Sequence, residues 1–380
     1  MTRSGRLLAG CVAAVVVAVG TICTPVPAKN AVELGAVDAL MQRLMSAYNI
    51  PGTALALIRD GQIVLEKGYG FRDLETHAPV TTGTLFNIGS ISKSFTALGI
   101  AQLVDQHRLD LDTPVITSLH ELRLSNAQVT QTVTLRQLLS HTSGLPPDEQ
   151  WPPQVPASRQ EEMHEIATMP ITARPGTLFQ YCSRCVVLAS YVLERVTGES
   201  WEAYTRTHIF APLGMTTASF GPDGLQHVTD GAQPYQYYSF AGQVPVPWSR
   251  LGFLRPLAPA GGINASVTDM ARYALFQLGD GTASGQRVVV AQTLAELHRP
   301  EIAVPPYWRF GPVQDLHYAL GWFTGDYRGV HLVYHNGANP GFRAAIVLVP
   351  SARTGVVILT NGESDVFAGM VTLSLLAELL

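Results

Sequence analysis

The chain has 380 residues, of which 47% are apolar and 14% are charged, and its formal net charge is −4 at pH 7. This composition provides enough apolar side chains for a sizeable core, in one large or two modest domains. The small negative charge and the lack of a basic run argue against nucleic acid as a partner.

The N-terminus has the pattern of an export signal. Two arginines are followed by an uncharged apolar run at residues 7–23 and by small residues at a cleavage site ending in Ala28. We therefore predict an export signal at residues 1–28 and one mature domain at residues 29–380. The apolar run is at the short edge of what spans a bilayer, so an uncleaved membrane anchor is an alternative.

A second alternative to a cleaved signal is lipidation. The sequence Leu-Ala-Gly-Cys at residues 8–11 resembles the lipobox at which bacterial lipoproteins are cut and lipidated. The apolar run continues well beyond Cys11, however, which is the wrong order for that processing. With each of these signals we expect a secreted, periplasmic or cell-envelope protein.

The predicted elements of the mature chain begin with a helix at residues 31–48, where apolar side chains recur with helical periodicity. Strands are expected at residues 53–58 and 62–69, joined by the hairpin signal Arg59-Asp60-Gly61. Further helices are predicted at residues 90–106, 135–140, 184–197 and 266–278.

The C-terminal part changes to short strands, predicted at residues 318–324, 330–335, 344–350 and 355–360, before a last helix at residues 365–379. Strands therefore occur at both ends of the chain, and helices dominate the middle. We predict an α+β fold in which one antiparallel sheet is built from both chain ends and flanked by helices, with a mainly helical region inserted.

Without residues 1–28 the chain retains two cysteines, Cys182 and Cys185. A cysteine pair in an exported protein often forms a disulfide, but the i, i+3 spacing is tight for disulfide geometry within a regular helix. No βαβ pattern surrounds the pair, which argues against a thioredoxin-like motif. A local disulfide and two structural thiols therefore stand as alternatives.

A serine and a lysine three residues apart form a candidate catalytic pair. Positions i and i+3 share a helical face, so the Ser90 hydroxyl and the Lys93 ammonium can touch, and a serine becomes a good nucleophile only beside such a partner. Average composition gives about one such pair by chance in a chain of this length. The chain has only three lysines, however, and apolar residues surround this one.

Two later segments add polar groups of the same kind. Tyr181 and Ser183 lie between a Pro-Gly turn and a helix, and His335 ends a strand candidate before Asn336 and Gly337. In this order the motifs resemble those of the serine β-lactamase and penicillin-binding-protein superfamily, specifically its class C-like branch with D-peptidases and esterases. Lesser resemblances extend over residues 37–360, at residues 134–145, 209–215 and 259–263.

The resemblance implies that Ser90 forms an acyl-enzyme, that Lys93 is buried and moves a proton, and that Tyr181 is general base and then general acid. Backbone N–H groups of Ser90 and Ala338 would form an oxyanion hole, at about 3–4 kcal/mol per donor. A phenol has a pKa of about 10, so this role of Tyr181 needs flanking cations, and Lys93 and His335 are the candidates. The family needs no cofactor or metal.

Two substitutions depart from the family pattern, and both concern substrate recognition. Ser183 replaces an asparagine that contacts a substrate amide carbonyl, and Asn336 replaces a threonine or serine that helps to hold a substrate carboxylate. We therefore expect an exported esterase or D-peptidase, acting on carboxylic esters or peptidoglycan peptides. The alternatives are a true β-lactamase and, from another class, a catalytically weak protein that binds cell-wall peptides.

The histidines do not favour a metal site. The sequence contains no His-Glu-x-x-His, and His331 and His335 lie on a strand candidate, so a zinc site is a poor interpretation. We expect His141 to be structural.

Overall fold

The computed structural model describes residues 34–151, 156–308 and 311–380. The predicted export signal, its alternative as an anchor and the lipobox-like cysteine lie outside these residues and stay predictions. Within the described ranges, no helix has the length and apolar character needed to cross a membrane.

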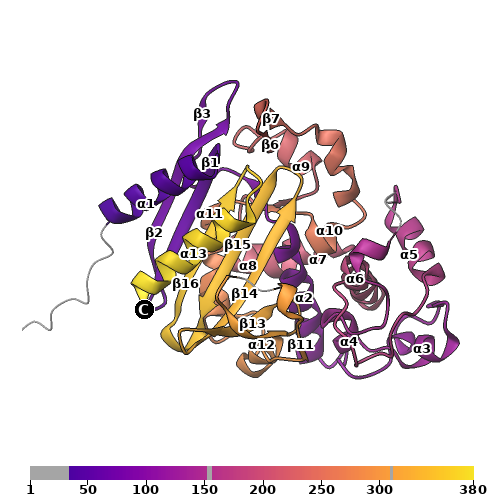
Figure 1. Cartoon of the computed structure of the whole chain (residues 1–380). Helices are drawn as coiled ribbons and strands as arrows, with labels where there is room; N and C mark the ends of the chain where they lie inside the picture. The colour runs from indigo at the N-terminus through magenta and orange to yellow at the C-terminus, as the bar shows by residue number, and fades with distance from the viewer. Residues whose placement is uncertain (1–33, 152–155, 309–310) are drawn as a thin grey trace, which may run out of the picture.

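In the described residues, one antiparallel sheet of nine strands forms the centre of the molecule (Figure 1), in the order β11-β12-β13-β14-β15-β16-β1-β2-β3. Its first and last segments meet in the middle, where β1 pairs with β16 and Thr53 lies opposite Thr360. This confirms the predicted sheet built from both chain ends. The strands are β1 (Gly52–Arg59), β2 (Gln62–Asp73), β3 (Ala78–Pro79), β11 (Ile302–Ala303), β12 (Gln314–Tyr318), β13 (Phe323–Tyr327), β14 (Val330–Asn339), β15 (Phe342–Val349) and β16 (Thr354–Thr360).

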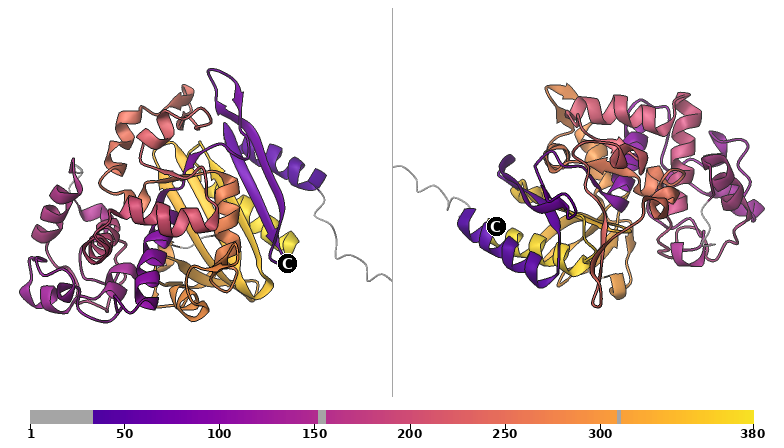
Figure 2. Two further views of the ribbon diagram at one scale, coloured as in Figure 1. Left: turned by 180° about the vertical axis from the view of Figure 1, so that it is seen from behind. Right: turned by 90° about the horizontal axis from the view of Figure 1, so that it is seen from above.

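Helices cover both faces of this sheet. The terminal helices α1 and α13 lie side by side on one face, and the inserted region covers the other (Figure 2). The helices are α1 (Leu34–Ala47), α2 (Ser92–Asp105), α3 (Ala127–Thr132), α4 (Leu135–Leu139), α5 (Arg159–Thr168), α6 (Ser183–Thr197), α7 (Trp201–Thr205), α8 (Ala211–Leu213), α9 (Asp223–Gln226), α10 (Ala258–Gly261), α11 (Val267–Gln277), α12 (Ala291–Leu297) and α13 (Asp365–Leu379).

The two faces of the central strands belong to two different hydrophobic cores. Leu55 and Leu57 of β1 pack in the core beneath α1 and α13, whereas Ala54 and Ala56 pack in the core shared with α2 and α11. Successive side chains of a strand point to opposite faces, so a strand buried on both sides has an uninterrupted apolar sequence. The core strands therefore have no alternation of polar and apolar residues.

Short elements connect the helical region to the sheet. A three-stranded sheet in the order β4-β8-β5 joins β4 (Phe86–Asn87), β5 (Ser219–Phe220) and β8 (Ile263–Ala265). Two small hairpins pair β6 (Tyr235–Tyr238) with β7 (Gly242–Pro245), and β9 (Thr282–Ala283) with β10 (Gln286–Arg287). Because only a short turn separates β4 from α2, this small sheet fixes where α2 begins relative to the large one.

One predicted strand is wrong. Residues 318–324 do not form a strand; they include the turn that joins β12 to β13, closed by a hydrogen bond of 2.7 Å from the Ala319 N–H to the Trp322 carbonyl. The turn residues Ala319, Leu320 and Trp322 are fully buried. A buried apolar turn has the composition of a core strand, so the sequence pattern could not distinguish the two.

Candidate active site

Ser90 lies in a single 3₁₀ turn, Gly89–Ile91, that leads directly into α2. Lys93, in the first turn of α2, donates hydrogen bonds to Ser90 Oγ at 3.0 Å and to the Ala260 carbonyl at 2.9 Å. The Lys93 side chain is fully buried. Burial disfavours the charged ammonium and lowers the pKa of Lys93 to about 8, against a smaller opposing effect of the Asp148 carboxylate.

Tyr181 approaches the same serine from the loop before α6. Its hydroxyl interacts with the Ser90 side chain, and Lys93 Nζ lies 4.8 Å from the centre of its ring. Burial raises the pKa of Tyr181 well above its ordinary value, although the interaction with Ser90 acts in the opposite direction. The phenol is therefore protonated at neutral pH and is a proton donor in the resting site.

His335 lies on β14, with its ring centre 6.4 Å from that of Tyr181. Its Nδ1 lies 2.7 Å from the Asn336 carbonyl and its Nε2 lies 3.1 Å from the Tyr318 hydroxyl. Burial first, and then the charge of Lys93, lower the pKa of His335 to about 3. The resemblance implied that His335 is a second cation beside Tyr181, but the burial of its ring makes it neutral at physiological pH.

Two glycines allow β14 to lie directly against the turn that carries Ser90. A Cβ atom at Gly337 would lie 1.9 Å from the Ile88 carbonyl oxygen. One at Gly89, whose φ is +53°, would lie 2.6 Å from the Ala338 nitrogen. Only the absence of both side chains permits this contact, and it places Ala338 at the edge of the Ser90 site.

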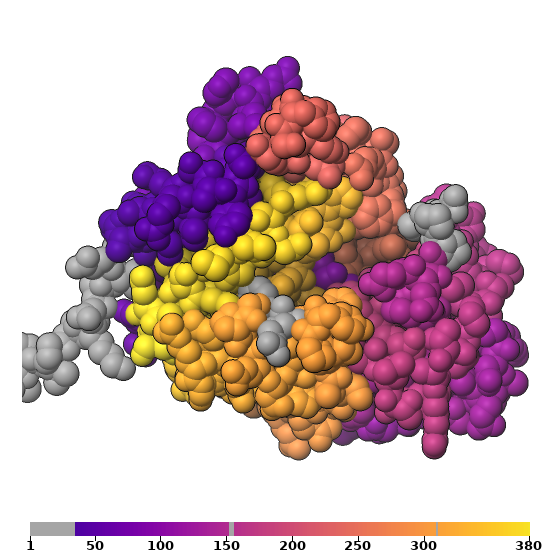
Figure 3. Space-filling model, in the orientation of Figure 1, coloured from indigo at the N-terminus to yellow at the C-terminus, as the bar shows by residue number. Residues whose placement is uncertain are grey.

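A cavity of about 580 Å³ opens above Ser90, and Tyr181, His335, Asn336 and Ala338 also line it. Figure 3 shows the corresponding hollow where the yellow and orange strands of the sheet meet the magenta helical region. Ser183 is also in the cavity wall, so six of the eight predicted site residues line this cavity. A seventh, Lys93, lies beneath Ser90 and donates a hydrogen bond to it. The eighth, Gly337, provides the close backbone approach.

The residue predicted to contact a substrate amide is held by a carboxylate that the sequence analysis missed. The N–H and the hydroxyl of Ser183 donate to the two oxygens of Asp148, each at 2.6 Å. Asp148 precedes Ser183 by 35 residues, in a proline-rich loop with no local motif, so no pattern pointed to it. Asn336 also lines the cavity, and its Oδ1 is buried without a hydrogen-bond partner among the described residues.

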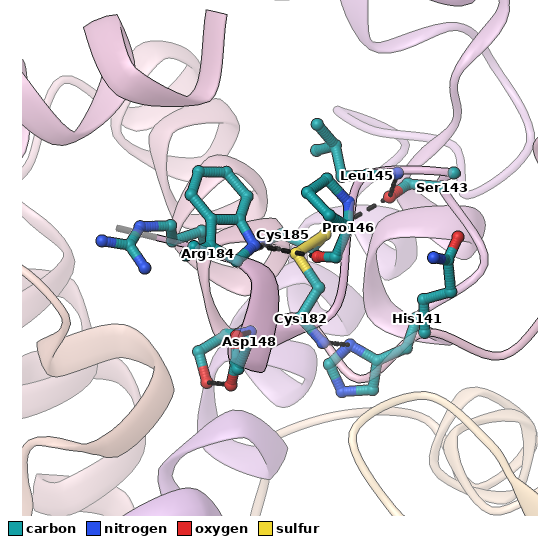
Figure 4. Close-up of a disulfide and its surroundings, with 12 residues drawn as sticks. His141, Ser143, Leu145, Pro146, Asp148, Cys182, Arg184 and Cys185 are labelled. Atoms are coloured by element: carbon teal, nitrogen blue, oxygen red, sulfur yellow. Dashed lines mark hydrogen bonds between the residues drawn. A yellow bond between two sulfur atoms is a disulfide. The ribbon is translucent and has the colours of Figure 1, made fainter. Parts of the chain in front are cut away.

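Cys182 and Cys185 form a disulfide with a Cα–Cα distance of 5.3 Å. Cys182 is the N-cap of α6 and has an extended backbone, so the pair does not lie within regular helix, and the geometric objection to a bond does not hold. Figure 4 shows His141 and Asp148 flanking this helix start. The Cys182 N–H donates to His141 Nδ1 at 3.2 Å, and the His141 ring lies 4.4 Å from that of Tyr181.

The chain is similar to known proteins over most of its length. A family model described as Beta-lactamase matches residues 37–378. Penicillin-binding protein 4 of Amycolatopsis lactamdurans is 30% identical over 334 residues, which cover 84% of this chain and 83% of that protein. Protein flp of Staphylococcus aureus (strain NCTC 8325 / PS 47) is 27% identical over 332 residues, or 87% of this chain; the match spans only 63% of that longer protein.

Solved structures show the same fold. The octameric penicillin-binding protein homologue from Pyrococcus abyssi superposes with a TM-score of 0.78 at 29% identity, over 91% of this chain and 77% of that one. A penicillin-binding protein from Bacillus halodurans, at 22% identity, gives a TM-score of 0.73 over 88% of this chain and 99% of that one. The chain therefore belongs to the beta-lactamase family, within the serine β-lactamase and penicillin-binding-protein-like superfamily.

Proposed function

We propose that the protein is an exported serine hydrolase that forms an acyl-enzyme on Ser90. Membership of the family supports a serine-hydrolase or penicillin-binding-protein-like function in general. The observation that carries the specific proposal is the convergence of three groups: Lys93 Nζ lies 3.0 Å from Ser90 Oγ, and Tyr181 interacts with the same serine and borders the same cavity. A nucleophile needs such proton-transfer partners within hydrogen-bond reach.

In the first half of the reaction, neutral Lys93 takes the proton of Ser90 while Oγ forms a bond to the substrate carbonyl carbon. A pKa of about 8 leaves part of Lys93 neutral near physiological pH, whereas Tyr181 remains protonated. Lys93 therefore has the role of general base, which the family resemblance implied for Tyr181. The carbonyl oxygen becomes an oxyanion, which the backbone N–H groups of Ser90 and Ala338 would stabilise.

The leaving alcohol or amine then takes the proton of the Tyr181 hydroxyl, and the ammonium of Lys93 returns a proton to the phenolate. Water attacks the ester carbonyl of the acyl-enzyme and loses its proton to the same pair of groups. The bond to Ser90 Oγ breaks, the serine regains its proton, and a carboxylic acid is released. The net reaction is hydrolysis, with each proton returned to its starting group.

For substrates we propose carboxylic esters or D-amino-acid peptides such as those of peptidoglycan. Two departures from the family pattern argue against typical β-lactams as substrates. Ser183, hydrogen-bonded to Asp148, stands where the family has an asparagine, and the amide of Asn336 stands where the family has a hydroxyl. Export is proposed from the pattern of residues 1–28, with retention as an anchor or lipidation at Cys11 as alternatives. The disulfide supports an oxidising compartment.

Three substrates measured side by side test this function: a short-chain p-nitrophenyl ester, a D-alanyl-D-alanine peptide and nitrocefin. We expect hydrolysis of the ester or the peptide to exceed that of nitrocefin, and Ser90→Ala to abolish each activity. Dominant hydrolysis of nitrocefin would instead show a β-lactamase. If none of the three substrates is hydrolysed but wall peptides still bind, the result would favour the alternative of a catalytically weak protein that binds cell-wall peptides.

A further inference from the structure

We propose that the cavity selects acyl donors that carry a positively charged nitrogen, and that Asp148 determines this selectivity. The proposal rests on the acyl transfer at Ser90 and adds the class of substrate that the site accepts. Its basis is the position of one carboxylate beside the catalytic groups, the balance of charge around the cavity, and the aromatic walls.

Asp148 lines the cavity and is partly exposed to it. A carboxylate has about four lone-pair directions, and the Ser183 N–H and hydroxyl use two of them. Among the described residues Asp148 has no cation within ion-pair distance. Its negative charge nevertheless acts on both Lys93 and Tyr181, so it lies close to the reacting groups.

The other charges that line the cavity are already balanced, apart from the exposed Glu149. Arg184, the one arginine or lysine among the lining residues, lies 2.6 Å from a carboxylate oxygen of Glu162. Asp365 lies 2.8 Å from the guanidinium of Arg343. Among the residues that line the cavity, a substrate carboxylate would therefore find no unpaired arginine or lysine, since Lys93 lies beneath Ser90. Asp148 would repel such a carboxylate and attract a cationic group.

Aromatic rings form much of the rest of the wall, namely Trp151, Tyr181, Phe253, Trp308, Phe323 and Tyr334. Two of these rings already lie against protein cations: Arg184 stacks at 4.5 Å over Trp151, and Lys93 lies 4.8 Å from the centre of Tyr181. Ring faces attract cations, most strongly when these are poorly hydrated, as alkylammonium groups are. The walls and Asp148 thus favour the same kind of substrate.

Two esters of equal shape and different charge test the proposal. One is the p-nitrophenyl ester of γ-trimethylammoniobutyrate, and the other is the ester of its carbon isostere, in which a quaternary carbon replaces the nitrogen. We expect the wild-type kcat/KM for the cationic ester to exceed that for the neutral one by about tenfold or more. In Asp148→Asn, which keeps an oxygen to accept the Ser183 N–H, this ratio should fall to within about twofold of unity.

The matched control is Glu75→Gln, which removes one negative charge from an exposed position at the turn between β2 and β3. This variant should keep the wild-type ratio.

Hydrolysis of the neutral ester reports on folding of Asp148→Asn, and the wild-type ratio tests the proposal even if that variant does not fold. A wild-type ratio near or below one, or a ratio unchanged in Asp148→Asn, would overturn the proposal and leave the acyl transfer intact. If the protein hydrolyses neither ester, that result would contradict the proposed function itself and this inference with it.

Discussion

At the scale of single residues, the charge states of the site depend on burial by distant parts of the chain. The pair Ser90 and Lys93 could be found from the sequence because both residues lie on one turn of backbone. The neutral state of His335 could not, because it results from packing around β14. The burial of Lys93 was expected from the family resemblance, but its second hydrogen-bond acceptor was not, because the Ala260 carbonyl is 167 residues away.

The first prediction at this scale concerns pH. Because burial lowers the pKa of Lys93 from 10.5 to about 8, the neutral base becomes more abundant as pH rises. The kcat/KM of ester hydrolysis should therefore rise about tenfold per pH unit below this pKa and level off above it. Since the pKa of His335 is about 3, no step is expected between pH 5 and 7, and the His335→Gln variant should keep the inflection. An inflection near pH 6.5 that this substitution removes would show that His335 titrates in the reaction.

A second prediction concerns the glycine contact between β14 and the serine turn. Gly337→Ala places a Cβ atom 1.9 Å from the Ile88 carbonyl oxygen, which must separate the two segments. We expect the rate of acylation to fall about a hundredfold, because small displacements of catalytic groups have effects of this size. The control is Gly35→Ala on α1, where nothing lies within 4 Å of the added Cβ. Equal acylation rates in Gly337→Ala and the control would contradict the close approach.

At the scale of elements, the start of α6 shows both what the sequence could predict and what it could not. The helix itself was predicted, at residues 184–197, from its apolar periodicity, and the structure has it at Ser183–Thr197. The disulfide remained open because the extended backbone of its first cysteine, Cys182, is not visible as a pattern. The loop with Asp148 could not be assigned to this site either, because its contacts form only in the folded chain.

We predict that the disulfide positions Tyr181, which directly precedes Cys182 in the chain. Replacing both cysteines with alanine should lower stability by about 2 kcal/mol, the value expected for so short a loop. The acylation rate should fall about tenfold or more while KM changes little, since the loss is one of catalytic geometry. Thermal unfolding and single-turnover kinetics measure the two effects, and the variant should not respond to added reductant. An unchanged acylation rate would leave the disulfide with a stabilising role alone.

At the scale of the whole molecule, the sheet joins the two ends of the chain. Strand patterns at both ends and helical patterns between them were sufficient to predict this architecture, because few arrangements bury such strands. The buried turn between β12 and β13 was missed, since burial removed the polar residues that normally mark a turn. The terminal helices α1 and α13 then cover one face of the sheet, where the Tyr48 and Phe367 rings lie 6.4 Å apart.

The packing of α13 gives a prediction of its own. Phe367 of α13 is fully buried in the core between this helix and the sheet, whereas its neighbour Val366 is 59% exposed. Phe367→Ala should therefore reduce the free energy of unfolding by about 3–5 kcal/mol, and Val366→Ala should change it by less than about 1 kcal/mol. Urea unfolding of both variants measures the difference. Similar values for the two would mean that α13 does not pack on the sheet as described.

The central claim is that Ser90 becomes acylated. The most direct measurement is the reaction of the full chain with a fluorescent fluorophosphonate, followed by peptide mass spectrometry of the labelled protein. We expect one adduct on the peptide that contains Ser90, no labelling of Ser90→Ala, and normal labelling of the control Ser92→Ala or Ser94→Ala where those variants fold. Labelling that persists in Ser90→Ala, or an adduct on another residue of wild-type protein, would contradict the account.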